Sequence, residues 1–202
     1  MSSPGSDICS ARRDADGLLR ADLLELNLGC SPFTHDIAGD SDKNAVWKIT
    51  ENMVAPGSHV VFDWDNTLKL YDTVTRRLSL RVSYDLLYHL KHDLGCHLYI
   101  ISALRPSALN LATLLHEVHA LGLTDIFCNL PGQGAVGDVL VCGDYARRGN
   151  VIICGYNKAE TFLKLSSFSA ARGDRVFFFD DESVNVSNFR TLVHGSVCYL
   201  CK

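Results

Sequence analysis

From residue 58 onward, short apolar runs alternate with longer amphipathic runs, and this alternation limits the fold more than any other feature of the sequence. The apolar runs are rich in Val, Ile, Phe and Tyr and predict strands at 59–65, 96–102, 150–156, 175–181 and 196–201. The amphipathic runs predict helices at 83–95, 106–122, 159–170 and 185–193. Alternating strands and helices are typical of an α/β fold, so we expect a Rossmann-like three-layer sandwich with a mostly parallel central sheet.

The first 57 residues lack this alternation and predict a separate extension. Residues 1–17 are rich in Ser, Gly, Asp and Arg, which predicts a flexible tail. The leucine spacing over 18–29 predicts one short amphipathic helix, and no firm structure is assigned to 30–57. We therefore expect an N-terminal extension over 1–57 and one α/β domain over 58–202, with a small hairpin over 68–82.

Composition limits the compartment and the class of partner. The 202 residues are 47% hydrophobic, which suits one globular domain. The net charge is -4, whereas proteins that coat duplex nucleic acid typically carry a net positive charge. The eight cysteines form no dense framework and the N-terminus has no apolar signal, so we expect an intracellular protein, cytoplasmic or nuclear. Arg105 and Pro106 interrupt the longest apolar region, so we expect no membrane partner. The sequence leaves the oligomeric state open.

Short polar side chains follow the predicted strands at their carboxyl ends, where ligands bind in open parallel sheets. Three strands end in oxygen-bearing side chains and a fourth is followed by a lysine: Asp63 and Asp65, Ser102, Asp180 and Asp181, and Lys158. Four clustered carboxylates require a cation to offset their repulsion, and Mg²⁺ prefers oxygen ligands. A Mg²⁺ ion beside a lysine and a hydroxyl suits a phosphoryl group, so the pattern predicts phosphoryl transfer to an aspartate.

These residues carry a family resemblance. The motif DWDNT at 63–67, the strand end IIS at Ser102, Lys158 and the pair DD at 180–181 resemble the four successive motifs of the haloacid dehalogenase (HAD) superfamily. The resemblance covers about residues 58–202. It implies that Asp63 is the nucleophile and that Asp65 is the acid and base, with its backbone carbonyl reaching the metal.

The resemblance also implies the remaining roles in the site. Ser102 and Lys158 would hold the transferring phosphoryl group, and Thr67, counted with the substrate-binding residues, would brace the loop after the nucleophile. Arg105 lies near enough in sequence to contact an anionic substrate. The implied Mg²⁺ ligands are a set of four carboxylate residues: Asp63, Asp65, Asp180 and Asp181. Whether Asp180 or Asp181 binds the metal directly is left open.

The spacing of the motifs leaves no room for a cap domain. The segment from Asp65 to Ser102 is filled by the hairpin, one helix and one strand, and the segment from Ser102 to Lys158 holds a helix, short strands and turns. Uncapped sites of this superfamily suit phosphates presented by macromolecules, as in the RNA polymerase II tail phosphatases and the polynucleotide phosphatases. We expect a phosphorylated macromolecule as partner, and we favour a phosphoprotein, with Ser, Thr or Tyr phosphate, over nucleic acid.

Several alternatives stay open at this stage. The chain could be a polynucleotide 3'-phosphatase, a small-molecule phosphatase covered by a partner or by residues 1–57, or a scaffold that keeps the fold without catalysis. Receiver domains use similar residues, but their acidic pair precedes the phosphorylated aspartate, whereas here it comes last. Trp64 is expected in the core, and Asn185 is expected to be a structural hydrogen-bonding residue.

Overall fold

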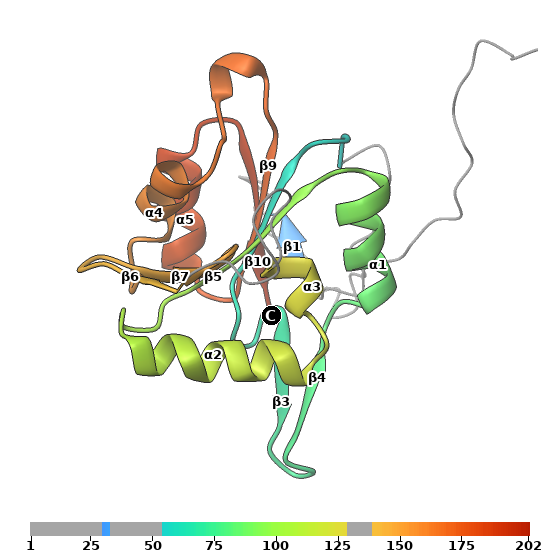
Figure 1. The fold of residues 1–202 in the computed structure, drawn as a ribbon. Coiled ribbons are helices and arrows are strands. Elements are labelled where there is room, and N and C mark those ends of the chain that lie inside the picture. Colours follow the sequence, from blue (N-terminus) through green and yellow to red (C-terminus); the bar gives the residue numbers. More distant parts are fainter. Residues whose placement is uncertain (1–29, 33–53, 129–138) are drawn as a thin grey trace, which may run out of the picture.

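The computed structural model describes residues 30–32, 54–128 and 139–202, and its centre is an eight-stranded sheet (Figure 1). The strand order is β1-β10-β9-β2-β5-β8-β7-β6. The bounds are β1 (Cys30–Pro32), β2 (His59–Phe62), β5 (His97–Ser102), β6 (Leu140–Val141), β7 (Ala146–Arg148), β8 (Val151–Ile153), β9 (Val176–Asp180) and β10 (Ser196–Cys201). Strands β10, β9, β2, β5 and β8 are mutually parallel, while β1, β7 and β6 are antiparallel to their neighbours.

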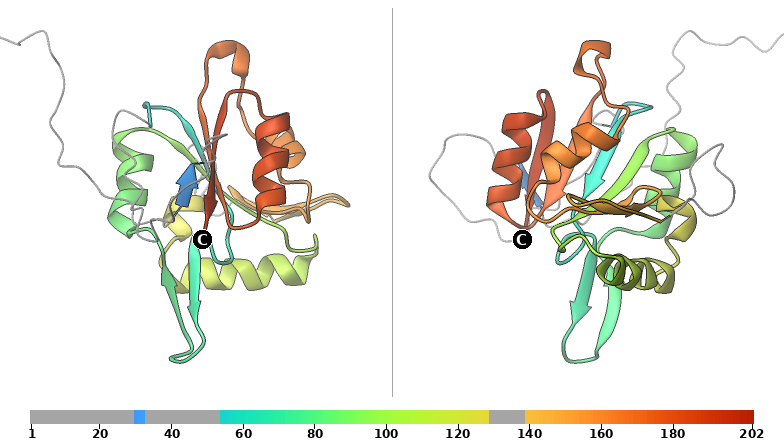
Figure 2. Two further views of the ribbon diagram at one scale, coloured as in Figure 1. Left: turned by 180° about the vertical axis from the view of Figure 1, so that it is seen from behind. Right: turned by 60° about the vertical axis from the view of Figure 1, so that its left-hand side comes forward.

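Helices cover both faces of this sheet, as Figure 2 shows from two further directions. The helices are α1 (Tyr84–Tyr88), continued by the π-helix η1 (His89–Asp93), then α2 (Ala108–Ala120), α3 (Thr124–Phe127), α4 (Lys158–Leu165), the 3₁₀ helix η2 (Ala170–Arg172) and α5 (Ser183–Leu192). Successive strand residues point to opposite faces. Val60 and Phe62 pack in a core with α1, α2 and α3, and Val61 packs in a second core with α4 and α5. The expected α/β fold with a mostly parallel central sheet is confirmed.

The strands and helices predicted within residues 58–202 are all present. Most are shorter than predicted, whereas β10 has the predicted bounds and α5 begins two residues earlier than predicted. The predicted hairpin is formed by β3 (Lys69–Asp72) and β4 (Arg77–Leu80), which pair antiparallel outside the main sheet. The predicted helix at 18–29 lies outside the described residues. Strand β1 comes from the predicted extension and pairs antiparallel with β10, so this part of 1–57 belongs to the central sheet.

Serine side chains fix where two helices begin. Ser83 Oγ accepts a hydrogen bond from the amide of Leu86 at the start of α1, and Ser107 Oγ accepts one from the amide of Asn110 at the start of α2. Each bond satisfies one of the amides that an α-helix leaves without a partner in its first turn.

Among the helices of 54–128 and 139–202, none has both the length and the apolar character needed to cross a membrane.

His59 lies buried at the opposite end of the sheet from the strand ends that carry the predicted site. Its ring stacks on His97 at a centroid distance of 4.8 Å, and its Nδ1 lies 3.3 Å from the hydroxyl of Tyr99. Burial, together with His97, lowers the pKa of His59 to about 4, although Asp174 acts in the opposite direction. The structure therefore holds this imidazole in its neutral form near neutral pH.

Because His59 is buried in its neutral form, we expect the free energy of unfolding to decrease in acid. The pKa of His59 is about 4 in the folded chain against 6.5 for the ordinary side chain, so the unfolded state binds more protons between these values. Its contribution to the free energy of unfolding is complete above about pH 6.5 and decreases by about 3 kcal/mol as the pH falls to about 4. Urea unfolding at about pH 7 and about pH 4.5 should show a smaller acid loss for His59→Phe than for wild type. Equal losses in the two proteins would show that His59 is not the group responsible.

Candidate functional site

A cavity of about 260 Å³ lies at the carboxyl ends of the parallel strands. Its lining is mainly polar and comes from four separate segments: Asp63, Asp65, Asn66, Ser102, Ala103, Leu104, Lys158, Asp181, Glu182 and Asn185. The lining follows β2, β5, β8 and β9 because parallel strands bring their carboxyl ends to one edge of a sheet. This is the edge at which the sequence places the predicted site.

Asp63 and Lys158 form the buried centre of the site. Asp63 directly follows β2, and its amide donates to the carbonyl oxygen of Phe179 in β9 at 2.8 Å. This hydrogen bond fixes the backbone that carries the Asp63 carboxylate. Lys158 is the first residue of α4 and is only 2% exposed. Its Nζ lies 2.5 Å from Asp63 Oδ1 and 2.5 Å from Asp180 Oδ2. One ammonium group therefore bridges two buried carboxylates.

Asp180 has its hydrogen-bonding capacity largely occupied by the protein. Its Oδ1 accepts from the amide of Glu182 at 2.9 Å and from Asn185 Nδ2 at 3.0 Å, while Oδ2 accepts from Lys158. The side chain is fully buried, and such a carboxylate is stable there only when hydrogen bonds and charges compensate it. Asp180 thus serves to hold the ammonium of Lys158 in place. The prediction that Asn185 is a structural hydrogen-bonding residue is confirmed.

The charges in the site do not balance without a proton or a cation. Burial raises the pKa of Asp63 to about 7, with Asp180 acting in the same direction and Lys158 against it. Burial lowers the pKa of Lys158, but Asp63 and Asp180 outweigh it and raise the pKa above its usual value. Lys158 therefore stays charged, and its single positive charge faces two buried carboxylates. A bound cation would relieve the repulsion between these carboxylates.

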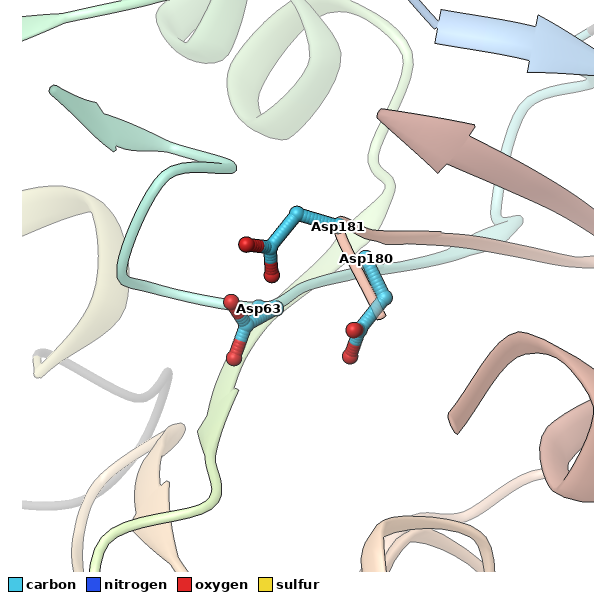
Figure 3. Close-up of side chains that lie close together, drawn as sticks. All are labelled: Asp63, Asp180 and Asp181. Atoms are coloured by element: carbon cyan, nitrogen blue, oxygen red, sulfur yellow. The ribbon is translucent and has the colours of Figure 1, made fainter. Parts of the chain in front are cut away.

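Three carboxylates lie close enough together to hold a metal ion (Figure 3). Asp63, Asp180 and Asp181 each offer an oxygen, and these oxygens lie within 4.8 Å of one another. Asp181 is less buried than the other two, lines the cavity, and its Oδ2 accepts a hydrogen bond from Asn66 Nδ2 at 3.2 Å. The donors are all carboxylate oxygens, a set that fits a hard, oxygen-preferring cation.

A tight turn after Asp63 directs some of its side chains to the cavity and others to the core. The amide of Lys69 donates to the carbonyl oxygen of Trp64 at 2.8 Å, and Asn66 adopts a left-handed conformation with φ of 57°. Asparagine tolerates this conformation better than most residues. Asp65 and Asn66 consequently line the cavity, whereas Trp64 is fully buried, which confirms its expected place in the core.

The structure brings together most, but not all, of the residues that the sequence singles out. Ser102 lies buried at the end of β5 and lines the cavity together with Asp63, Asp65, Lys158 and Asp181. The described residues that line the cavity do not include Thr67 or Arg105. Thr67 is fully buried, and within the described part of the chain its hydroxyl has no hydrogen-bond partner. Arg105 is exposed on the loop after β5.

Two polar lining residues, Asn66 and Glu182, were not predicted from the sequence as parts of the site. Asn66 Nδ2 donates a hydrogen bond to Asp181, and the amide of Glu182 donates one to Asp180. The signal for Asn66 was present in the motif DWDNT, because an asparagine between two turn residues indicates a left-handed position. Glu182 acts through its backbone, which no side-chain pattern reveals.

The assembled site combines a buried carboxylate, a fixed ammonium group, a hydroxyl and a cluster of oxygen donors beside an accessible cavity. A tetrahedral oxyanion fits this chemistry, because Lys158 and Ser102 offer hydrogen-bond donors while a bound cation offsets further negative charge. None of the family models, curated proteins or solved structures compared with the chain matches it. The functional assignment therefore rests on the sequence motifs and on this geometry.

Proposed function

We propose that the protein is a Mg²⁺-dependent phosphomonoester phosphatase of the HAD type, acting through a phosphoaspartyl intermediate on Asp63. The observation that carries the proposal is the bridge from Lys158 to Asp63 and Asp180 beside the Asp181 carboxylate at the cavity wall. An aspartate held by a buried lysine next to an oxygen-rich cation site is suited to attack a phosphoryl group.

In the first step, Asp63 attacks phosphorus and displaces the alcohol of the substrate. Asp63 Oδ1 is held by Lys158, which leaves Oδ2 for the attack. The new bond joins Oδ2 to phosphorus, the bond from phosphorus to the leaving oxygen breaks, and its electron pair departs with that oxygen. Asp65 donates a proton to the leaving oxygen, while Lys158 and Ser102 hold the phosphoryl oxygens.

In the second step, water cleaves the phosphoaspartate. Asp65, now ionised, accepts a proton from the water as its oxygen bonds to phosphorus. The bond between phosphorus and Asp63 breaks, its electron pair returns to the carboxylate, and inorganic phosphate leaves. One aspartate therefore serves as acid in the first step and as base in the second.

Asp181 and Asp180 receive different roles in this proposal. Asp181 would bind Mg²⁺ together with Asp63 and the backbone carbonyl of Asp65, because its carboxylate faces the cavity. Asp180 would orient Lys158, since its oxygens already accept hydrogen bonds from the lysine, from Asn185 and from the Glu182 amide. When bound, Mg²⁺ supplies charge that stabilises the phosphoryl group during transfer.

We further propose that the substrate phosphate is carried by a macromolecule, with a phosphoprotein favoured over nucleic acid. The proposal assumes a site without a cap domain. In the described chain, the hairpin β3–β4, α1 with η1, and β5 fill the segment from Asp65 to Ser102, and α2, α3 and the strands β6 to β8 fill the segment from Ser102 to Lys158. The exposed position of Asp65 and Asn66 on the cavity wall agrees with access by a large substrate.

The test is hydrolysis of phosphomonoesters by the purified full chain, first without divalent metal and then with a chosen metal added. EDTA should abolish the release of phosphate from p-nitrophenyl phosphate, and Mg²⁺ should restore it better than Ca²⁺, whose longer and more flexible coordination misplaces the reacting groups. A panel of phosphoserine, phosphothreonine and phosphotyrosine peptides, a 3'-phosphorylated oligonucleotide and a sugar phosphate should show the fastest turnover on a peptide. Undiminished activity in EDTA would remove the metal from the mechanism, and folded protein that hydrolyses no phosphate would refute the proposed function.

A further inference from the structure

A partly buried charged cluster beside the cavity connects Asp65 to helix α2. Lys69, at the start of β3, places its Nζ 2.5 Å from Asp65 Oδ1 and 3.0 Å from Glu117 Oε2. The indole Nε1 of Trp64 donates to the same Glu117 oxygen at 2.7 Å. We call Lys69, Glu117 and Trp64 the α2 anchor. None of its members lines the cavity.

The α2 anchor is more rigid than an ordinary surface ion pair. An exposed pair four residues apart would fix a side chain only weakly, because both partners are mobile and solvent-screened. Here Lys69 is only 8% exposed and Trp64 is fully buried, so the ammonium group of Lys69 is held by protein groups and not by solvent. The amide of Lys69 also donates to the carbonyl oxygen of Trp64, which ties its backbone to the turn. The half-exposed Asp65 side chain therefore meets a cation whose position is fixed.

We infer that Lys69, held by Glu117 and Trp64, is a positioning residue that keeps the Asp65 carboxylate oriented at the cavity for hydrolysis of the phosphoaspartate. The inference rests on the proposed function. Lys69 binds Asp65 Oδ1, which leaves Oδ2 to accept the proton of the attacking water. The balance of the step is unchanged: water gives its proton to Asp65 and its oxygen to phosphorus, and Asp63 regains its electron pair. Lys69 itself does not line the cavity, so its role is to position Asp65 and not to contact the substrate.

The inference predicts a selective defect when the positive charge is removed. In Lys69→Met the Asp65 carboxylate loses its fixed partner, so breakdown of the phosphoenzyme should slow about tenfold, part of the larger factor that a general base contributes. Formation of the phosphoenzyme from p-nitrophenyl phosphate should be nearly unchanged, because nitrophenolate leaves without a proton. Consequently kcat and KM should fall together while kcat/KM stays constant, and phosphoenzyme should accumulate.

The experiment is a single-turnover rapid quench with Mg²⁺ and labelled p-nitrophenyl phosphate, which measures formation and breakdown separately. Glu117→Gln keeps the shape and the contact with Trp64 but removes the charge that holds Lys69, so breakdown should slow in the same direction by a smaller factor. Lys69→Arg should restore breakdown toward the wild-type rate. The matched control is Lys164→Met, which removes an exposed lysine that pairs with Asp144 at 3.8 Å, and it should behave as wild type.

Four outcomes would overturn the inference. A parallel fall in kcat and kcat/KM with a smaller burst in Lys69→Met would show that Lys69 only supports the fold. Faster breakdown in Lys69→Met or Glu117→Gln would show that the lysine withholds Asp65 from the cavity. Wild-type protein that forms no phosphoenzyme would refute the proposed function itself, and with it the role of Lys69. A wild type with normal phosphoenzyme but unchanged variants would refute only the role of Lys69.

Discussion

Replacing Asp63 by asparagine should reduce turnover to less than about a hundredth of wild type while the protein stays folded. The amide has almost the shape of the carboxylate, but it is a poor nucleophile toward phosphorus. Burial and the neighbouring Asp180 disfavour the charge on Asp63, so its removal should not lower the free energy of unfolding. The measurement is steady-state hydrolysis of p-nitrophenyl phosphate with Mg²⁺, together with urea unfolding of the same preparation.

A matched substitution separates this effect from a general response to lost charge. Asp144→Asn neutralises a carboxylate whose side chain is 82% exposed, and it should leave the rate unchanged. Asp63→Asn with more than about a hundredth of the wild-type rate would show that another group attacks phosphorus. A folded but inactive variant beside an active Asp144→Asn is the expected pair of results.

The second large effect concerns the leaving group. Asp65→Asn removes the proton donor, so the formation of phosphoenzyme from phosphoserine should slow by much of the range of about 10² to 10⁴ that general acid catalysis contributes. Formation from p-nitrophenyl phosphate should slow far less, because nitrophenolate leaves without protonation. The comparison requires rapid quench of the formation step, since the later hydrolysis should slow equally for both substrates.

The result of this comparison decides the role of Asp65. A change in selectivity toward aryl phosphates identifies it as the general acid. Equal losses in the formation step for alkyl and aryl phosphates would instead show that the side chain serves the metal site or the fold. The side chain lines the cavity and lies next to Lys69, so the structure gives it a place from which either role could be exercised.

The elements of the fold that could be predicted are those with a strong local pattern. Strands β2, β5, β9 and β10 each contain an uninterrupted apolar run with mostly buried side chains, and the parallel sheet follows from the alternation of such strands with amphipathic helices. Strands β1, β6 and β7 have only two or three residues each, too few to show a period. Their pairing depends on which neighbour the edge of the sheet offers, and a local pattern does not contain that information.

The site was predictable where it depends on topology. Asp63, Ser102 and Lys158 follow different strands, and any parallel sheet with these strands brings such residues to one edge. Thr67 illustrates the limit of this reasoning. It belongs to the same motif, but the turn directs its side chain into the interior, away from the cavity.

The α2 anchor could not be predicted because it depends on packing between distant segments. Glu117 is 48 positions from Lys69 and 53 from Trp64. In the sequence, nothing distinguishes it from the other polar residues of an amphipathic helix. Only the position of α2 beside the turn after Asp63 reveals the contact. A contact of this kind becomes visible only in the structure, because the sequence predicts which face of a helix is apolar but not which element packs against its other residues.

The central claim is the covalent bond between phosphorus and Asp63, and acid quench followed by mass spectrometry tests it most directly. Wild-type protein mixed with substrate and Mg²⁺ should carry one phosphoryl group on the peptide that contains Asp63, and hydroxylamine should remove it as it does other acyl phosphates. The modification should be absent from Asp63→Asn and should accumulate in Asp65→Asn, where hydrolysis is slowed. Phosphate release without any covalent intermediate, or a phosphoryl group on a residue other than Asp63, would contradict the account.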